Sequence, residues 1–188
     1  MSLAIVRWES FVPVLIYVLI FLWAGPLVAT PGEARADEQL ANLQSDAAYP
    51  VTKVLVLKSE RRLLLLNGEF VQRSFEVELG RNPVGAKQHQ GDGRTPEGDY
   101  IIDWRKRDSQ YYRALHISYP SGRDVEKARS LGRPAGGMIM IHGQPSQYNV
   151  QYLKIDDDWT QGCIAVSNAA MDELWSVVAD GTPIEIRP

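Results

Sequence analysis

The sequence predicts a mainly β domain, an antiparallel, sandwich-like arrangement of short strands with peripheral helices. Short apolar runs recur between clusters of turn residues, as expected for strands that cover a shared core. The pair Asn67-Gly68 separates two of these runs, and this dipeptide is a strong local signal for a β-hairpin. Only two segments have the apolar spacing of an amphipathic helix.

Strands are expected from the start of this domain to its end. Segments 53–58 and 62–66 are apolar enough to be buried, whereas 75–79 alternates and predicts a strand with one polar face. Further strands are predicted at 99–104, 114–119, 138–141, 162–166 and 183–186.

The two predicted helices have recognisable N-terminal signals. Asp124 is expected to cap a short helix over 125–131. Ser167 or Asn168 is expected to cap a second helix that runs to about residue 178. The apolar face of this second helix is predicted to consist of Met171, Leu174, Trp175 and Val178.

The N-terminus predicts export. Arg7 precedes an apolar run over 14–24, and Ala34-Arg35-Ala36 supplies small residues for signal-peptidase cleavage. Residues 1–36 are therefore expected to be a signal peptide, or an anchor if they stay uncleaved, and only then would a membrane be a partner. We expect a linker over 37–52, a single folded domain over 53–188, and a location in the periplasm or cell envelope.

Charge and acidic spacing argue against two other functions. A net charge of −3 does not favour nucleic acid, which prefers a basic face. The acidic run 156–158 lacks the spaced oxygen ligands and the glycine of a calcium loop, so a solvated loop is expected there.

Cys163 and His142 form the candidate catalytic pair. Cys163 is the only cysteine, His142 is one of three histidines, and each lies at the edge of a predicted strand. An imidazole can take the proton of a thiol, which then attacks a carbonyl, and can later protonate the leaving amine. A lone cysteine in an exported chain has no partner for an intramolecular disulfide, which favours a reactive role over an inert, buried one.

The other two histidines have plainer interpretations. His116 lies inside a predicted strand and is expected to be structural. His89 lies in the turn-rich segment 80–98 and is expected to be incidental, although Lys87, His89 and Arg94 could together meet an anionic substrate. Long loops in compact domains often bind ligands, so 80–98 and 144–159 are predicted to form the groove around the site.

The residues around the pair resemble the YkuD-type L,D-transpeptidase catalytic domain. That family has a histidine, a spacer, and then Ser/Thr-His-Gly-Cys followed by an apolar residue. Here 17 residues separate His142 from the run Thr160-Gln161-Gly162-Cys163-Ile164. Thr-Pro-Glu-Gly at 95–98 and Gly-Thr-Pro-Ile at 181–184 also resemble family motifs, and the likeness covers about 53–188.

The resemblance implies a peptidoglycan L,D-transpeptidase that acts on stem tetrapeptides, its expected partner, and forms 3–3 cross-links. Cys163 is the implied nucleophile and His142 the general base, then acid. The carbonyl of Gly143 is expected to orient His142, and the N–H groups of Gly162 and Cys163 to form the oxyanion hole. No metal or cofactor is implied. Substrate contact is expected from Arg94, Trp159, Thr160 and Gln161, although Trp159, like Tyr148 and Tyr152, could instead pin its loop.

Two departures from the family pattern keep other functions open. Gln161 replaces the usual histidine, and Ala165 replaces the usual Asn or Arg. A hydrolytic relative, namely an L,D-carboxypeptidase or an amidase that releases a wall-linked protein, or a non-catalytic wall-binding module, would fit these changes. A sortase would need an arginine on a following strand, and only Arg187 follows Cys163. A papain-like peptidase would place its cysteine before its histidine.

Overall fold

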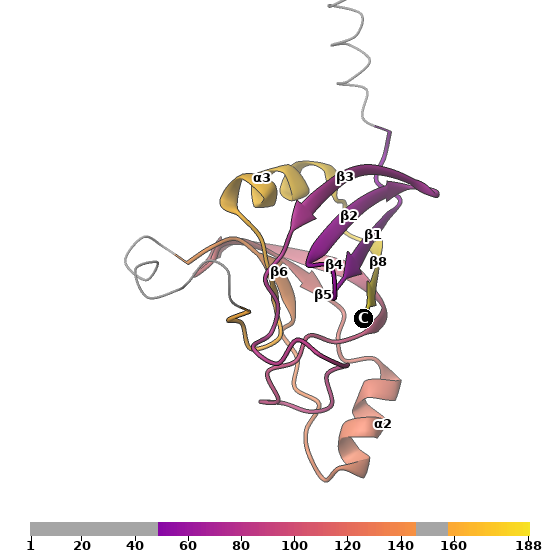
Figure 1. The fold of residues 1–188 in the computed structure, drawn as a ribbon, viewed down its shortest axis with the longest axis vertical. Helices are drawn as coiled ribbons and strands as arrows, with labels where there is room; N and C mark the ends of the chain where they lie inside the picture. The colour runs from indigo at the N-terminus through magenta and orange to yellow at the C-terminus, as the bar shows by residue number, and fades with distance from the viewer. Residues whose placement is uncertain (1–48, 146–157) are drawn as a thin grey trace, which may run out of the picture. The chain divides into compact units, whose positions relative to one another are not determined.

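The computed structural model describes residues 49–145 and 158–188 (Figure 1). The predicted signal peptide and the tyrosines Tyr148 and Tyr152 lie outside the described residues, as does most of the predicted linker. Within the described ranges, no helix combines the length and apolar character that crossing a membrane requires.

Eight strands form one hydrogen-bonded sheet in the order β3-β2-β1-β8-β4-β5-β6-β7. Most neighbours are antiparallel, while the β1–β8 and β6–β7 pairs are parallel. The predicted mainly β fold with peripheral helices is therefore confirmed. The strands are β1 (Lys53–Leu57), β2 (Arg62–Asn67), β3 (Phe70–Glu76), β4 (Gly98–Ser109), β5 (Tyr112–Ile117), β6 (Met140–His142), β7 (Ile164–Ala165) and β8 (Thr182–Arg187).

The hairpin between β2 and β3 forms where the sequence predicts it. Gly68 has a φ of +57°, in the left-handed region that glycine adopts at little cost. The strand predicted over 75–79 is only partly correct, because β3 ends at Glu76. Single bridges follow, in which Glu78 pairs with Ala165 and Gly80 with Thr160. Since β3 and β7 are opposite edges of the sheet, the bridge to Ala165 requires the sheet to curl over on itself.

The two helices lie at opposite ends of the sheet, α2 (Gly122–Ser130) beside the turn-rich segment and α3 (Asn168–Val177) beside β3 (Figure 1). Ser121, and not Asp124, caps α2, and Asp124 is the third helical residue of a reciprocal capping box. Ser167 caps α3 as predicted, since its hydroxyl accepts a hydrogen bond from the Ala170 N–H.

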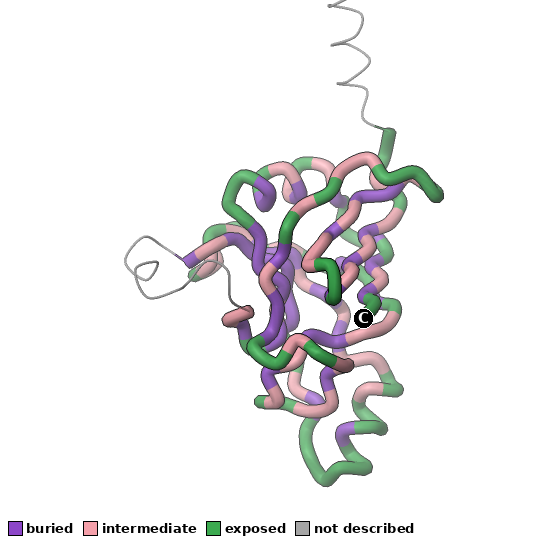
Figure 2. Tube along the Cα trace, in the orientation of Figure 1, coloured by how far each residue is buried: buried purple, intermediate pink, exposed green. Residues whose placement is uncertain are grey.

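The buried residues form one hydrophobic cluster, to which most of the strands and α3 contribute (Figure 2). Alternate residues of β1 and β2 face it, and the apolar face of α3 covers it through Met171 and Leu174. Ile141 and Ile164, which are paired across β6 and β7, are fully buried in this core. Because side chains alternate along a strand, the flanking residues His142 and Cys163 lie on the other face.

Two buried lysines fix the segment 80–98. Lys58, only 2% exposed, donates to Glu97 at 2.6 Å, to Gly85 O at 2.8 Å and to Thr95 O at 3.2 Å. Lys87 donates to Asp92 at 2.8 Å, and Asp92 also accepts backbone N–H groups from the same segment. Both cations are thus paired, as buried charges must be. The segment is a fixed structure without regular secondary structure.

The carboxylate of Asp92 should make the stability of the fold sensitive to acid. Burial alone would raise its pKa, but hydrogen bonds from Lys87 and from the N–H groups of Gln88, Arg94 and His89 outweigh burial and hold the pKa at about 2, below the ordinary 3.8. A carboxyl group whose pKa is lower in the folded state stabilises the fold at pH values above its ordinary pKa. For Asp92 this stabilisation is lost as the pH falls from 3.8 through about 2.

We therefore expect Asp92→Asn to lower the free energy of unfolding by about 1–2 kcal/mol at neutral pH and by much less below about pH 2.5. Urea denaturation at a series of pH values measures this. The exposed Asp99→Asn is the matched control and should leave the pH dependence unchanged. An equal destabilisation by Asp92→Asn at every pH would contradict the role given to its charge.

Candidate active site

The register of the sheet brings Cys163 and His142 to neighbouring strands. His142 pairs with Ala165 of β7 on one side and with Ala114 of β5 on the other. Residues paired across strands share a face, and so do residues two apart. Cys163, two residues before Ala165, therefore lies diagonally from His142 on the same face. No hydrogen bond joins the two side chains in the described structure.

The imidazole of His142 is oriented by the residue that follows it. Its Nδ1 lies 2.7 Å from Gly143 O. A carbonyl oxygen only accepts, so Nδ1 carries the proton and Nε2 is left with a free lone pair. This is the tautomer that a general base needs. Orienting the imidazole in this way is the role predicted for the Gly143 carbonyl. A side chain at Gly143 would have its Cβ 2.5 Å from Asn168 Oδ1, so the turn also needs glycine for space.

Two aromatic rings enclose His142. Tyr111 stacks on the imidazole with centroids 4.6 Å apart, and Trp159 meets it edge-on at 5.6 Å. The imidazole residue is only 3% exposed. Burial lowers the pKa of His142 below 6.5, and the hydrogen bond to Gly143 O opposes this only in part. His142 is therefore a neutral base at physiological pH. Tyr111 was not predicted, because nothing in its local sequence marks it.

The thiol of Cys163 is also in its neutral form. It is partly buried, and its Sγ lies 3.6 Å from Met138 O, to which it donates. Burial raises the pKa of Cys163 above 9.0, while a backbone hydrogen bond from Met140 and the charge of Lys87 oppose the rise. The resting pair is thus thiol and imidazole, not thiolate and imidazolium, so proton transfer must accompany attack.

The turn from Thr160 to Cys163 corrects two expectations. The Thr160 hydroxyl donates to Cys163 O at 2.7 Å and accepts the Gly162 N–H at 3.0 Å. Thr160 is buried and holds the turn, so it does not face a substrate. The Gly162 N–H is already used in this turn, which removes it from the predicted oxyanion hole. The Cys163 N–H has no partner among the described residues and remains as the expected donor.

Glycine at 162 is required by the turn itself. Its φ is +129°, and an added Cβ would lie 2.5 Å from Arg94 O and 3.3 Å from Ile139 Cδ1. The backbone of Arg94 therefore covers the residue before the nucleophile, which places the predicted substrate-binding arginine beside the site. Its guanidinium is half-buried. Gln161 is exposed on the other side of Gly162 and also remains available to a substrate.

Trp159 and Asp158 are anchored to the chain that follows β3. Trp159 Nε1 donates to Glu78 Oε2. Asp158 accepts from Arg61 at 2.6 Å and from the Leu79 N–H at 2.8 Å. The solvated loop predicted over 156–158 is thus wrong for Asp158, while 156–157 lie outside the described residues. Trp159 pins its segment and packs on His142, the second of the two roles considered for it.

The remaining histidines are accounted for locally. His116 Nδ1 lies 2.6 Å from Asp103 Oδ1, and its ring stacks on Trp104 at 4.5 Å, which agrees with the structural role predicted. His89 Nδ1 contacts Gln90 O at 2.8 Å within its own loop. In the part of the chain that is described, no group of three acidic, histidine or cysteine side chains is placed to hold a metal ion.

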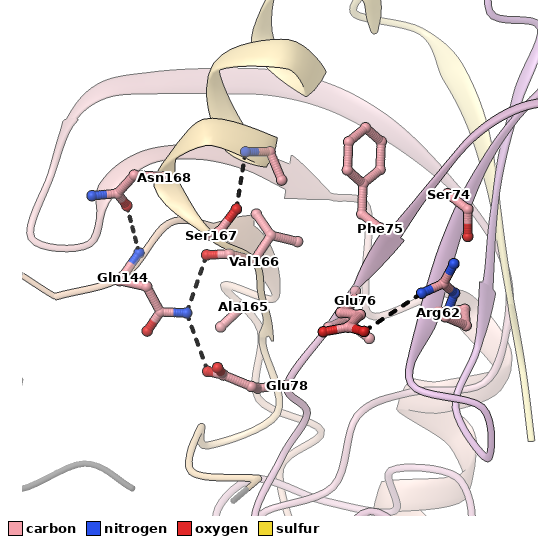
Figure 3. Close-up of a pocket in the computed structure, with 12 residues that line it drawn as sticks. Arg62, Ser74, Phe75, Glu76, Glu78, Gln144, Ala165, Val166, Ser167 and Asn168 are labelled. Atoms are coloured by element: carbon pink, nitrogen blue, oxygen red, sulfur yellow. Dashed lines mark hydrogen bonds and ion pairs between the residues drawn. The ribbon is translucent and has the colours of Figure 1, made fainter. Parts of the chain in front are cut away.

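A cavity close to the candidate pair is the second feature of this region. A cavity of about 710 Å³ is lined by Glu78, Gln144 and Ala165, with the start of α3 as another wall (Figure 3). It does not include His142 or Cys163 themselves. Ala165 lies between the cavity and His142, and its small side chain leaves this volume open.

Comparison with known proteins identifies the domain. A family model described as the L,D-transpeptidase catalytic domain (YkuD) matches residues 52–186. The chain belongs to this family. Over 131 residues it is 33% identical to YafK of Escherichia coli K12, whose name assigns it provisionally to the L,D-transpeptidases, and the match covers 66% of this chain and 46% of YafK. The chain thus spans about half the length of the curated relatives it matches.

Solved structures share the fold of this L,D-transpeptidase domain. The helical cell shape determining protein Pgp2 of Campylobacter jejuni, as a K307A mutant, matches with a TM-score of 0.56 and 24% identity, covering 74% of this chain and 48% of that one. Bd1075 of Bdellovibrio bacteriovorus matches with a TM-score of 0.50 and 23% identity, covering 74% and 49%. At these identities the likeness concerns the fold alone.

The turn before the nucleophile gives a stability prediction for the L,D-transpeptidase domain. Gly162→Ala should destabilise the fold by about 2–3 kcal/mol, because the new Cβ meets the Arg94 backbone at a positive φ. Chemical denaturation measures this. Gly122→Ala is the matched control, since a Cβ there meets nothing within 4 Å. Equal stabilities of the two variants would show that Arg94 does not cover residue 162.

The neutral resting pair gives a reactivity prediction. The alkylation rate of Cys163 by iodoacetamide should keep rising from about pH 7 to about pH 9.5, because burial raises the pKa of the thiol above 9.0. Stopped-time alkylation followed by mass spectrometry measures the profile. A rate that is already level at neutral pH would instead indicate a thiolate–imidazolium pair.

Proposed function

We propose that this domain is a peptidoglycan L,D-transpeptidase that works through a Cys163 thioester and joins stem peptides by 3–3 cross-links. The observation that carries the proposal is the placement of Cys163 and His142 on one face of adjacent strands, with Nδ1 of His142 held by Gly143 and Nε2 free. The family of the chain supports the reaction class, and the geometry supports the proposed roles of the two residues.

The first half-reaction forms the thioester. His142 Nε2 takes the thiol proton as Cys163 Sγ attacks the carbonyl between the third and fourth residues of a stem tetrapeptide. The developing oxyanion accepts the Cys163 N–H, a contact typically worth about 2.7–4 kcal/mol. His142 then protonates the amine of the terminal D-alanine, which leaves. The enclosure by Tyr111 and Trp159 keeps the imidazole neutral and ready to accept the proton.

The second half-reaction transfers the acyl group. The side-chain amine of a diamino acid in a second stem attacks the thioester carbonyl, and His142 Nε2 takes its proton. The C–S bond breaks, the thiol recovers a proton from His142, and an amide joins the two stems. Arg94 and Gln161 flank Gly162 and are the proposed substrate contacts. No step requires a metal or cofactor.

A hydrolytic relative is the second candidate. Gln161 stands where the family usually has a histidine next to Gly-Cys, so the group that would meet the second substrate is altered. Water in place of the amine would release a shortened stem, as in an L,D-carboxypeptidase, or free a wall-linked protein. The same thioester and the same two residues serve both outcomes.

The proposal includes a location. The wall substrate lies outside the cytoplasm, so residues 1–36 are proposed to direct export as a signal peptide or to remain as an anchor, leaving 53–188 in the periplasm or cell envelope. Peptidoglycan stem peptides are the proposed partner.

A muropeptide digest tests the function. The full chain is incubated with disaccharide-tetrapeptide and the products are analysed by mass spectrometry, beside Cys163→Ala. We expect 3–3 dimers with the native chain and none with the variant. His116→Gln, which removes a histidine outside the proposed mechanism, should still give dimers.

Other products would decide between the alternatives. Tripeptide without dimers would make the domain a carboxypeptidase. Release of protein from wall sacculi, without either product, would make it an amidase. No turnover, together with an unreactive Cys163, would favour a wall-binding module.

A further inference from the structure

We propose that Glu78 is a positioning residue for His142 and acts on it through Trp159. The proposal rests on the proposed Cys163–His142 chemistry. Its starting point is one oxygen, Glu78 Oε2, which accepts hydrogen bonds from Trp159 Nε1 and, at 3.2 Å, from Gln144 Nε2. Figure 3 shows the second of these bonds at the edge of the cavity. Glu78 therefore holds one residue that packs on the imidazole and another that follows the Gly143 carbonyl.

The backbone fixes Glu78 in this place. Glu78 N donates to Ala165 O at 2.9 Å, and Ala165 N donates to Glu78 O at 2.8 Å. On its other side Ala165 pairs with His142. The three residues therefore form a row across adjacent strands, with side chains on one face. The indole of Trp159 contacts both outer members of this row, because it donates to Glu78 and meets the His142 ring edge-on.

The ring of Trp159 controls the water around the imidazole. With Tyr111, 5.5 Å away between centroids, it encloses His142 and produces the burial that lowers the pKa of His142. Without Glu78, the indole N–H loses its acceptor in a partly buried place, which favours a different position for the ring. Water would then reach the imidazole, favour its protonated form and raise its pKa.

Glu78 also supports the imidazole of His142 through Gln144. The Gln144 side chain also donates to Val166 O at 3.1 Å, and the Gln144 backbone N–H donates to Asn168 Oδ1 at 2.8 Å. These contacts fix the chain directly after Gly143, whose carbonyl holds His142 Nδ1. The carboxylate of Glu78 thus supports both the orientation of the His142 imidazole and its shielding from water.

Other ionisable groups near the imidazole stay in place when Glu78 is changed. The titratable and charged groups that the described contacts place around this region are Glu78, Lys87, Tyr111, Tyr112, Arg113, Asp158, Cys163 and Asp172. Burial, and not any of these charges, is the main cause of the lowered pKa of His142. Loss of the negative charge of Glu78 would by itself lower the pKa of His142 further, so a rise identifies hydration as the cause.

The test compares three variants of the full chain. Glu78→Leu removes both hydrogen bonds, and Glu78→Gln keeps an accepting oxygen. Glu76→Leu is the control, since the Glu76 side chain is exposed and its carboxylate lies 3.8 Å from Arg62. The NMR titration of His142 gives its pKa, and muropeptide turnover gives kcat and KM. We expect Glu78→Leu to raise the pKa of His142 toward 6.5 and to lower kcat by about 10- to 100-fold with KM unchanged. Glu78→Gln should restore most of both, and Glu76→Leu should match the native chain.

A second variant tests whether Glu78 acts on His142 through Trp159, and it gives an independent measurement if Glu78→Leu does not fold. Trp159→Phe keeps a ring but removes the N–H donor, so its effect on the pKa of His142 should not add to that of Glu78→Leu in the double variant. An unchanged pKa of His142 in Glu78→Leu, with lower stability only, would overturn the proposal, and so would a raised KM alone, which would make Glu78 a substrate contact. The titration needs no turnover, so its result is separate from success or failure of the proposed reaction.

Discussion

The backbone pairing of residues 78–81 is the constraint on which the site depends. This short piece of chain leaves the edge strand β3 and bonds to Ala165 on one side and to Thr160 on the other. The first pairing joins the two edges of the sheet and closes the core. The second fixes the turn that carries Cys163. A single segment without regular secondary structure therefore couples the closure of the fold to the placement of Cys163.

Buried polar contacts, and not apolar packing alone, shape the surroundings of Cys163. Lys58 and Lys87 each satisfy their charge inside the turn-rich segment 80–98. That segment in turn places Arg94 O over Gly162. Since a buried cation with a missing partner is costly, these pairs specify one conformation of a stretch that contains little regular hydrogen bonding. The rigidity of the site thus comes from electrostatic contacts that lie outside the sheet.

Burial determines the resting protonation states of Cys163 and His142. It raises the pKa of Cys163 and lowers the pKa of His142, so both groups rest in their neutral forms. A thiol in its neutral form is less open to adventitious oxidation than a thiolate, which suits the single cysteine of this chain. In the proposed reaction His142 is charged only after it has taken the thiol proton, and its aromatic enclosure affects how readily that happens.

The sequence by itself determined most of the strands, the hairpin at Asn67-Gly68, the Ser167 cap and the candidate pair, because periodicity, turn chemistry and residue rarity are local properties. It also singled out Gly143 and Gly162, where a side chain would not fit. Only the tertiary structure decided that the Thr160 hydroxyl and the Gly162 N–H are used inside the turn, and that Tyr111 and Glu78 serve His142. The Thr160 contacts are local, but they depend on the exact conformation of the turn. The contacts of Tyr111 and Glu78 join residues that lie far apart in the chain and form only when the sheet brings their segments together.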